Sequence, residues 1–160
     1  MKEDRLRVWI DGACEPVNPG GTASYGLVIK HGQEILFEKG AVVGSGPSVS
    51  NNVAEYSGLI AFLEWYLEAR ASLVDRALKR RPAIYSDSSL LINQMTGEWR
   101  VKRGLYVPYY NKAQALIKEN RLDLGFWWVP RSENEDADRW SKKALLDAGV
   151  KLRIQPEVSV

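Results

Sequence analysis

Four carboxylate residues stand at places in the sequence where a negative charge needs a partner. Asp11 follows the alternating segment "RLRVWI", and Asp87 follows the short apolar run "AIYS". Glu55 and Asp138 each lie near the start of a segment with helical spacing. If the fold gathers all four, they would repel one another and raise one another's pKa values. A hard divalent cation would hold them ionised and close together, and Mg²⁺ prefers such carboxylate and water oxygens.

The chemistry that such a site supports is attack at phosphorus. Two ions about 4 Å apart suit an in-line displacement, because one activates water and the other stabilises the leaving oxygen. Each residue also has an ordinary explanation: Asp11 as a turn former before Gly12, Asp87 as a helix cap, and Asp138 as a surface residue. Four coinciding at compatible positions is a more specific pattern, and it predicts a site for two Mg²⁺ ions, or for Mn²⁺.

The segments around the carboxylates predict a mixed α/β sheet with helices packed on it. Apolar side chains alternate along the first strand, and later segments have apolar residues at helical spacing. The first three strands form a meander, and the later alternation of strands and helices favours parallel pairing. If strands one and four are parallel neighbours, Asp11 and Asp87 end them at the same edge of the sheet, where ligands bind. We expect strands over 5–11, 24–30, 34–43, 83–87 and 122–130, and helices over 53–70, 88–97, 109–120 and 132–149, while 71–81 favours neither a helix nor a loop.

Composition excludes several classes of protein. The single cysteine, Cys14, excludes an internal disulfide, and one histidine excludes a Cys/His zinc site. No signal peptide and no apolar run of about 20 residues is visible, which favours a cytoplasmic protein without a membrane partner. A net charge of +2 does not by itself indicate nucleic-acid binding. We expect a monomer with one domain over 1–149 and a tail over 150–160 that forms an extra strand or an arm.

Four segments in order resemble one known family, the type 1 ribonucleases H. They are "IDGACEPVNPGGTASYG" (10–26), "SNNVAEY" (50–56), "YSDSSLLI" (85–92) and "NEDADRWSKKAL" (134–145). The resemblance covers about residues 5 to 148. It implies the ribonuclease H-like fold, a five-stranded mixed sheet with three antiparallel strands followed by parallel ones.

The resemblance also implies an activity and roles for the carboxylates. Members of the family cleave the RNA strand of RNA–DNA hybrids and leave 3′-hydroxyl and 5′-phosphate ends. Asp11 would bridge two metal ions, Glu55 and Asp87 would complete the site on the leaving-group side, and Asp138 would hold the ion that activates water. Double-stranded RNA is a further potential substrate.

Substrate contacts are implied in two regions. The backbone at Gly12 and the side chains of Asn18, Asn51 and Asn52 resemble elements that contact the minor groove and the 2′-hydroxyls. Trp99 resembles an aromatic that packs against the DNA strand, with phosphate charge from Arg100 and Lys102. Turn or cap chemistry remains an alternative for each Asn, and a core position remains one for Trp99. Four further residues are expected in the core: Cys14, Trp127, Trp128 and Trp140.

Two features depart from the family pattern. Residues 98–108 are too short for the basic helical protrusion that many members carry. Arg131 stands in the loop where many members place a histidine; it cannot shuttle a proton, but it could position a phosphate.

Two other functions remain open. One is a resolvase or exonuclease of the same superfamily, which would have no use for the "SNN" segment. The other is a catalytically silent module that binds hybrid or double-stranded RNA, in which four idle acids would only repel phosphates.

Overall fold

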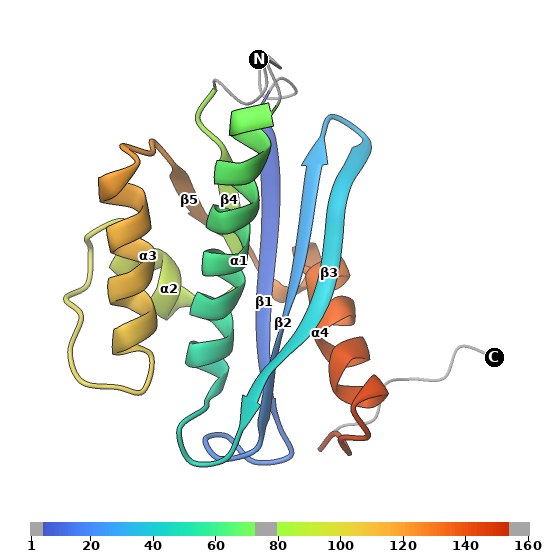
Figure 1. Ribbon diagram of the computed structural model, residues 1–160. Coiled ribbons are helices and arrows are strands. Elements are labelled where there is room, and N and C mark those ends of the chain that lie inside the picture. The colour runs from blue at the N-terminus through green and yellow to red at the C-terminus, as the bar shows by residue number, and fades with distance from the viewer. Residues whose placement is uncertain (1–4, 73–79, 154–160) are drawn as a thin grey trace.

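A five-stranded sheet in the order β3-β2-β1-β4-β5 forms the centre of the molecule (Figure 1). The structure is a computed structural model that describes residues 5–72 and 80–153. β1 pairs with β2 and β2 with β3 in antiparallel fashion, whereas β1, β4 and β5 run parallel. The predicted mixed sheet is therefore confirmed. The elements are β1 (Leu6–Glu15), β2 (Thr22–His31), β3 (Glu34–Ser45), α1 (Asn51–Ser72), β4 (Ala83–Ser86), α2 (Ser89–Met95), α3 (Val107–Glu119), β5 (Gly125–Trp128), the 3-10 helix η3 (Arg131–Glu133) and α4 (Glu135–Asp147).

Most elements end within two residues of the prediction, and the larger differences are in β1, β5 and α4. Asp11 does not end β1, because pairing with β2 carries that strand on to Glu15. The parallel pairing of β1 with β4 stops at Ile10, so Asp11 is still the first residue beyond it. β5 is shorter than the apolar run 122–130, since only Gly125–Trp128 pair with β4. The last helix starts at Glu135 instead of 132, because η3 comes first.

Helices cover the two faces of the sheet unequally. Helices α1 and α2 pack on one face with α3 against α1, and α4 lies on the other face against β1, β2 and β3 (Figure 1). The alternating side chains of Leu6, Val8 and Ile10 are fully buried in the core on the α1 side, as predicted. Burial of such a side chain stabilises the fold by about 1.5–3 kcal/mol. This core gives the carboxylates a rigid base.

Part of the opposite face is left open, and the prediction of a core position for two tryptophans of β5 was wrong. Trp127 and Trp128 are 52% and 54% exposed rather than in the core. For Trp127 the reason is that β5 is an edge strand and α4 covers only β1 to β3. Trp128 is the next residue and points to the other face at the end of the strand, where its indole N–H donates to the Asp87 carbonyl at 3.2 Å. Trp140 is only half-buried, with its indole N–H donating to Glu38 at 3.2 Å. Cys14 is buried, as expected.

The segments at the margins of the described structure need separate mention. Most of the ambiguous segment, 73–79, and most of the tail, 154–160, lie outside the described residues. The beginning of the tail is described, and Leu152 is buried. Within 5–72 and 80–153, no helix has the length and apolar character to cross a bilayer.

Candidate active site

Three carboxylates from three different elements meet at one edge of the sheet. Asp11 lies just beyond the parallel part of β1, Asp87 follows the last residue of β4, and Glu55 lies in the second turn of α1. One oxygen from each lies within 4.8 Å of the others. The sequence-based expectation that these residues gather is met, because parallel neighbouring strands end together.

Asp138 approaches the same place from the other face of the sheet. Its charge acts on Asp11, and its Oδ2 accepts a hydrogen bond from Lys142 Nζ at 2.9 Å. Two contacts let α4 lie this close to the sheet. A Cβ on Gly26 would overlap the backbone oxygen of Ala137, and the buried Asn134 side-chain amide donates to the carbonyl of Ile10 at 2.9 Å.

Glu55 is held by hydrogen bonds to both of its oxygens. The backbone N–H of Gly12 donates to Oε1 at 2.9 Å, and the Ser86 hydroxyl donates to Oε2 at 3.2 Å. The Ser86 hydroxyl in turn accepts from the N–H of Ser88 at 3.0 Å. Only glycine fits at position 12, because a Cβ there would lie 2.6 Å from the backbone nitrogen of Glu55. Gly12 therefore sets the approach of α1 to β1.

Burial makes this cluster costly without a cation. Asp11 is 6% exposed, and its burial, followed by the charges of Glu55 and Asp87, raises its pKa to about 11. Burial, followed by the charge of Asp87, raises the pKa of Glu55 to about 8. Burial also raises the pKa of Asp87, although the Arg131 guanidinium opposes that rise. The three carboxylates fit a hard divalent cation, because their oxygens converge and two of the three are buried. Among the ion pairs of residues 5–72 and 80–153, none neutralises them.

A groove of about 570 Å³ opens over the carboxylates. Polar and apolar side chains line it together. Arg131 is among them, and its guanidinium acts on Asp87. Contact of Arg131 with a phosphate stays a prediction. The groove is lined by Asp11, Gly12, Ala13, Cys14, Glu15, Asn18, Asn51, Glu55, Asp87, Ser88, Trp128, Arg131, Asp138, Lys142 and Arg153.

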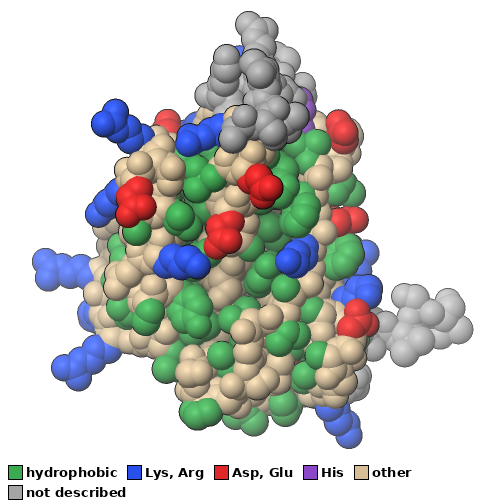
Figure 2. Space-filling model, viewed as in Figure 1, with side chains coloured by type: hydrophobic (Ala, Val, Ile, Leu, Met, Phe, Trp, Pro, Cys, Tyr) green, Lys and Arg blue, Asp and Glu red, His purple; other side chains and the backbone are tan. Residues whose placement is uncertain are grey.

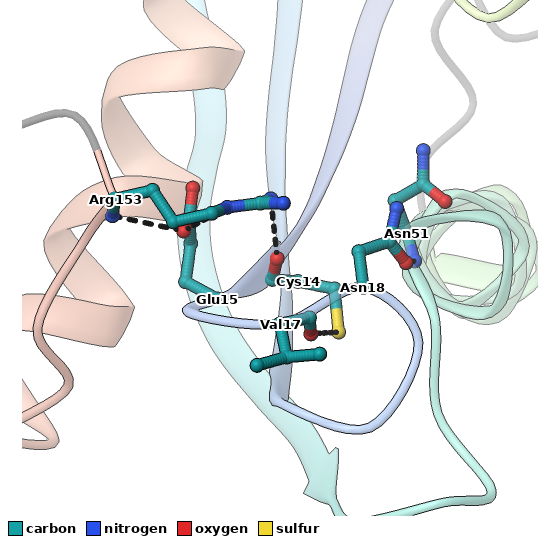
Figure 3. Close-up of polar contacts among 6 residues, drawn as sticks. All are labelled: Cys14, Glu15, Val17, Asn18, Asn51 and Arg153. Atoms are coloured by element: carbon teal, nitrogen blue, oxygen red, sulfur yellow. Dashed lines mark hydrogen bonds and ion pairs between the residues drawn. The ribbon is translucent and has the colours of Figure 1, made fainter.

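Two of the predicted substrate residues meet where the loop between β1 and β2 packs against the start of α1. Asn18 Oδ1 accepts the N–H of Asn51 at 3.0 Å, which ties the 16–21 loop to the first turn of the helix (Figure 3). The cap of α1 itself is Ser50, whose hydroxyl accepts from Val53 at 3.2 Å. The Asn18 side chain thus has a structural role in the loop, the alternative that the sequence left open for it. Asn51 is exposed and lines the groove.

The other predicted contacts lie apart from this groove. Asn52 is half-buried and does not line it. Trp99, Arg100 and Lys102 lie in the loop between α2 and α3, and all three are exposed. Figure 2 shows Lys and Arg side chains projecting from the edge of the molecule formed by α3 and this loop. The core alternative for Trp99 was wrong, since 49% of it is exposed.

Comparisons with known proteins agree with this geometry. The family model described as Reverse transcriptase-like matches residues 10–144. The N-terminal RNase H domain of Rv2228c from Mycobacterium tuberculosis superposes with a TM-score of 0.72 at 33% identity, over 91% of this chain and 96% of that one. The chain belongs to the type 1 ribonuclease H family. LC11-RNase H1, crystallised in complex with an RNA/DNA hybrid, superposes with a TM-score of 0.78 at 30% identity, over 90% of this chain and 99% of that one.

The match to curated ribonuclease H relatives is partial in length. The Bifunctional protein Rv2228c of Mycobacterium tuberculosis is 36% identical over 130 residues, which are 80% of this chain and 32% of that protein. The chain therefore spans about a third of the length of that relative. The Ribonuclease HI of Halobacterium salinarum is 31% identical over 147 residues, or 90% of this chain and 66% of that protein.

Sequence reasoning missed several residues that build this ribonuclease H site. Ser86 orients Glu55, and Asn134 ties α4 to β1. Arg153, from the tail, donates from its backbone N–H and Nε to Glu15 at 3.1 and 2.8 Å, and from its guanidinium to the Cys14 carbonyl at 3.0 Å (Figure 3). The only signal in the sequence was the spacing of Asn134, four residues before Asp138 on the same helical face.

Proposed function

We propose that this chain is an endonuclease that hydrolyses the RNA strand of RNA–DNA hybrids and leaves 3′-hydroxyl and 5′-phosphate ends. The observation that carries the proposal is the buried carboxylate cluster of Asp11, Glu55 and Asp87, with oxygens within 4.8 Å of one another and Asp138 facing Asp11. A related enzyme, LC11-RNase H1, is known in complex with an RNA/DNA hybrid, which supports this substrate class.

The carboxylates take different roles in this proposal. When bound, two divalent ions, Mg²⁺ or Mn²⁺, supply an activated water and positive charge for the leaving oxygen. Asp11 would contact both ions, Glu55 and Asp87 would hold the one on the leaving-group side, and Asp138 would hold the other. The hydrogen bonds from Gly12 and Ser86 fix the orientation of Glu55 before any ion arrives.

Selection of RNA falls to the start of α1 and the loop packed against it. The N–H of Gly12 is taken by Glu55, so this residue acts through the carboxylate it positions. The exposed side chain of Asn51 and the free amide group of Asn18 face the groove, where they would contact the minor groove and the 2′-hydroxyls. Contacts of this kind also admit double-stranded RNA if recognition of the DNA strand is relaxed.

Arg131 supplies charge to the same groove. Its guanidinium opposes the rise in the pKa of Asp87 that burial causes, which supports a role for its charge at the reacting centre. Because arginine remains protonated, it would position a phosphate by charge and hydrogen bonds and would not act as a base.

A cleavage assay on end-labelled duplexes tests the proposal. We expect cutting of the RNA strand of a hybrid with Mg²⁺, no cutting with EDTA, and intact duplex DNA; a double-stranded RNA arm measures how far DNA-strand recognition is relaxed. A single deoxynucleotide within the RNA strand should suppress cutting at nearby bonds, since the 2′-hydroxyl contact is lost. Equal cleavage of duplex DNA would favour a resolvase-like enzyme, and tight binding without cleavage would favour a silent module.

A further inference from the structure

A row of aromatic side chains crosses the part of the sheet that α4 leaves open. Trp9, Tyr85 and Trp127 are register partners on β1, β4 and β5, so their side chains point to the same face. Trp9 and Tyr85 stack with ring centroids 5.4 Å apart and planes at 28°. Trp127 continues the row at the edge strand and is 52% exposed. Trp9 and Tyr85 are half-buried. A row of partly exposed rings without a helix over it is a surface that another molecule can cover.

Cations surround this row. The Arg7 guanidinium lies 5.1 Å and Lys30 Nζ 5.4 Å from the centre of the Trp9 ring. Arg5 Nε is buried and has no hydrogen-bond partner among the described residues. Arg5 and Arg7 line a hollow of about 640 Å³ together with Tyr85, Trp127 and Trp128. Carboxylates offset little of this charge. Among the described ion pairs, Asp136 pairs with Lys30 at 3.8 Å, and no pair involves Arg5 or Arg7.

The hollow adjoins the catalytic groove. Trp128 lines both of them, and its indole N–H donates to the backbone carbonyl of Asp87 at 3.2 Å. A strand that leaves the carboxylate cluster past Trp128 therefore arrives directly at the aromatic row.

We propose that this face, formed by Arg5, Arg7, Trp9, Tyr85 and Trp127, binds an unpaired nucleic-acid strand that extends from the duplex in the catalytic groove. Bases stack on the exposed ring of Trp127 and on the accessible part of the half-buried Tyr85, and the phosphates lie against Arg5 and Arg7. Flat aromatic faces with interleaved cations are the features by which proteins bind single strands without sequence preference. An acidic peptide would be attracted by the cations, but it would leave the ring faces unused.

That the bound strand extends from a duplex in the catalytic groove rests on the proposed function, whereas binding of a single strand to this face does not. The test therefore separates the two. Fluorescence anisotropy with a labelled oligothymidylate in EDTA measures single-strand binding when no cleavage can occur. Comparing the cleavage of a blunt hybrid with that of the same hybrid carrying a single-stranded extension tests whether the strand extends from the groove to this face.

We expect Trp127→Ala to weaken oligothymidylate binding by about 5- to 150-fold, the range for losing one base stack. Trp127→Phe should retain most of the binding, because a ring remains. In Trp127→Ala the KM advantage of the extended hybrid should disappear, while cleavage of the blunt hybrid stays unchanged. Leu146→Ala is the control, since it removes another exposed apolar side chain, on α4, that does not line the hollow and should leave oligothymidylate binding intact.

Salt dependence adds a readout that a folding defect would not imitate. Arg5→Gln should reduce the slope of log affinity against log salt by about 0.7, the value for one phosphate contact on a single strand. The proposal is overturned if oligothymidylate does not bind, if Trp127→Ala binds it as tightly as the unmodified protein, or if polyglutamate binds in its place. If single strands bind through Trp127 but no hybrid is cleaved, only the proposed function fails.

Discussion

Replacing Asp11 by Asn should stabilise the metal-free protein while removing its dependence on metal. The side chain is almost fully buried, and two other carboxylates have oxygens within 4.8 Å of it. At that separation one pair of ionised groups repels by about 3.5 kcal/mol with an effective dielectric constant of about 20. Asn has nearly the same shape and no charge, so the substitution removes this cost.

The magnitude follows from the raised pKa. At pH 8 the folded chain keeps Asp11 protonated, since its pKa is about 11, whereas the unfolded chain ionises it. With an unfolded pKa of about 3.9 and about 1.36 kcal/mol per pH unit, the cost is at most about 5.6 kcal/mol. Water penetration and relaxation lower this limit, and we expect a gain of about 1–3 kcal/mol for Asp11→Asn, or about 2–12 °C in Tm for a domain of this size.

The sign of the pH dependence is fixed by the same shifts. A raised pKa in the folded state means that the folded protein binds more protons than the unfolded one, so stability falls as pH rises. In EDTA the protein should lose stability as the pH rises above about 4. The loss due to Glu55 continues to its folded-state pKa of about 8, and the loss due to Asp11 continues to its pKa of about 11. The difference in stability between the unmodified protein and Asp11→Asn should therefore increase with rising pH and vanish near pH 4.

Thermal melts at several pH values, with EDTA or with Mg²⁺, measure these differences. Mg²⁺ should raise the Tm of the unmodified protein, because an ion that binds only the folded state stabilises it, and should have little effect on Asp11→Asn. Asp123→Asn is the matched control, the same change at an exposed carboxylate, and its Tm should follow that of the unmodified protein. Coincident melting curves of the protein and Asp11→Asn at every pH would refute the reasoning.

Three further predictions concern activity and the support of the site. Glu55→Gln and Asp87→Asn should each reduce hybrid cleavage to near the background, because each removes a charged ligand for metal; near-normal turnover of Asp87→Asn in a steady-state assay would sink the assignment. Arg131→Ala should lower kcat by about tenfold to a hundredfold, as for a loss of about 1.4–2.7 kcal/mol, with an unchanged requirement for Mg²⁺; unaltered kcat and KM at two salt concentrations would make Arg131 a bystander. Asn134→Ala should lower the free energy of unfolding by about 1–3 kcal/mol, because the buried carbonyl of Ile10 loses its donor, and urea denaturation that matches the unmodified protein would show the contact to be unimportant.

The sequence was most informative where a local rule and a topological rule agreed. The alternation of Leu6, Val8 and Ile10 predicted both β1 and the face it buries. Parallel pairing of β1 with β4 then required Asp11 and Asp87 to meet, whichever residue ended each strand. The site was therefore predictable although the end of β1 was placed four residues too early.

Prediction failed where the outcome depended on which surface a neighbouring element covers. Trp127 and Trp128 have the composition of a buried strand, but both are exposed. α4 does not extend over β5 on the side of Trp127, and Trp128 lies at the end of the strand beside Asp87. The contact of Arg153 with Glu15 joins residues 138 positions apart, and no spacing within the sequence indicates it. Ser86 was missed because a serine before Asp87 looks like a cap residue until Glu55 is placed beside it.

The isotopic composition of the products tests the central claim most directly. Hybrid would be cleaved in water labelled with heavy oxygen in the presence of Mg²⁺, and the RNA fragments would be weighed by mass spectrometry. Attack by water held at the carboxylate cluster predicts one heavy oxygen in the new 5′-phosphate and an unlabelled 3′-hydroxyl. Fragments that end in an unlabelled 2′,3′-cyclic phosphate would mean that the RNA's own 2′-hydroxyl attacks, and they would contradict the account.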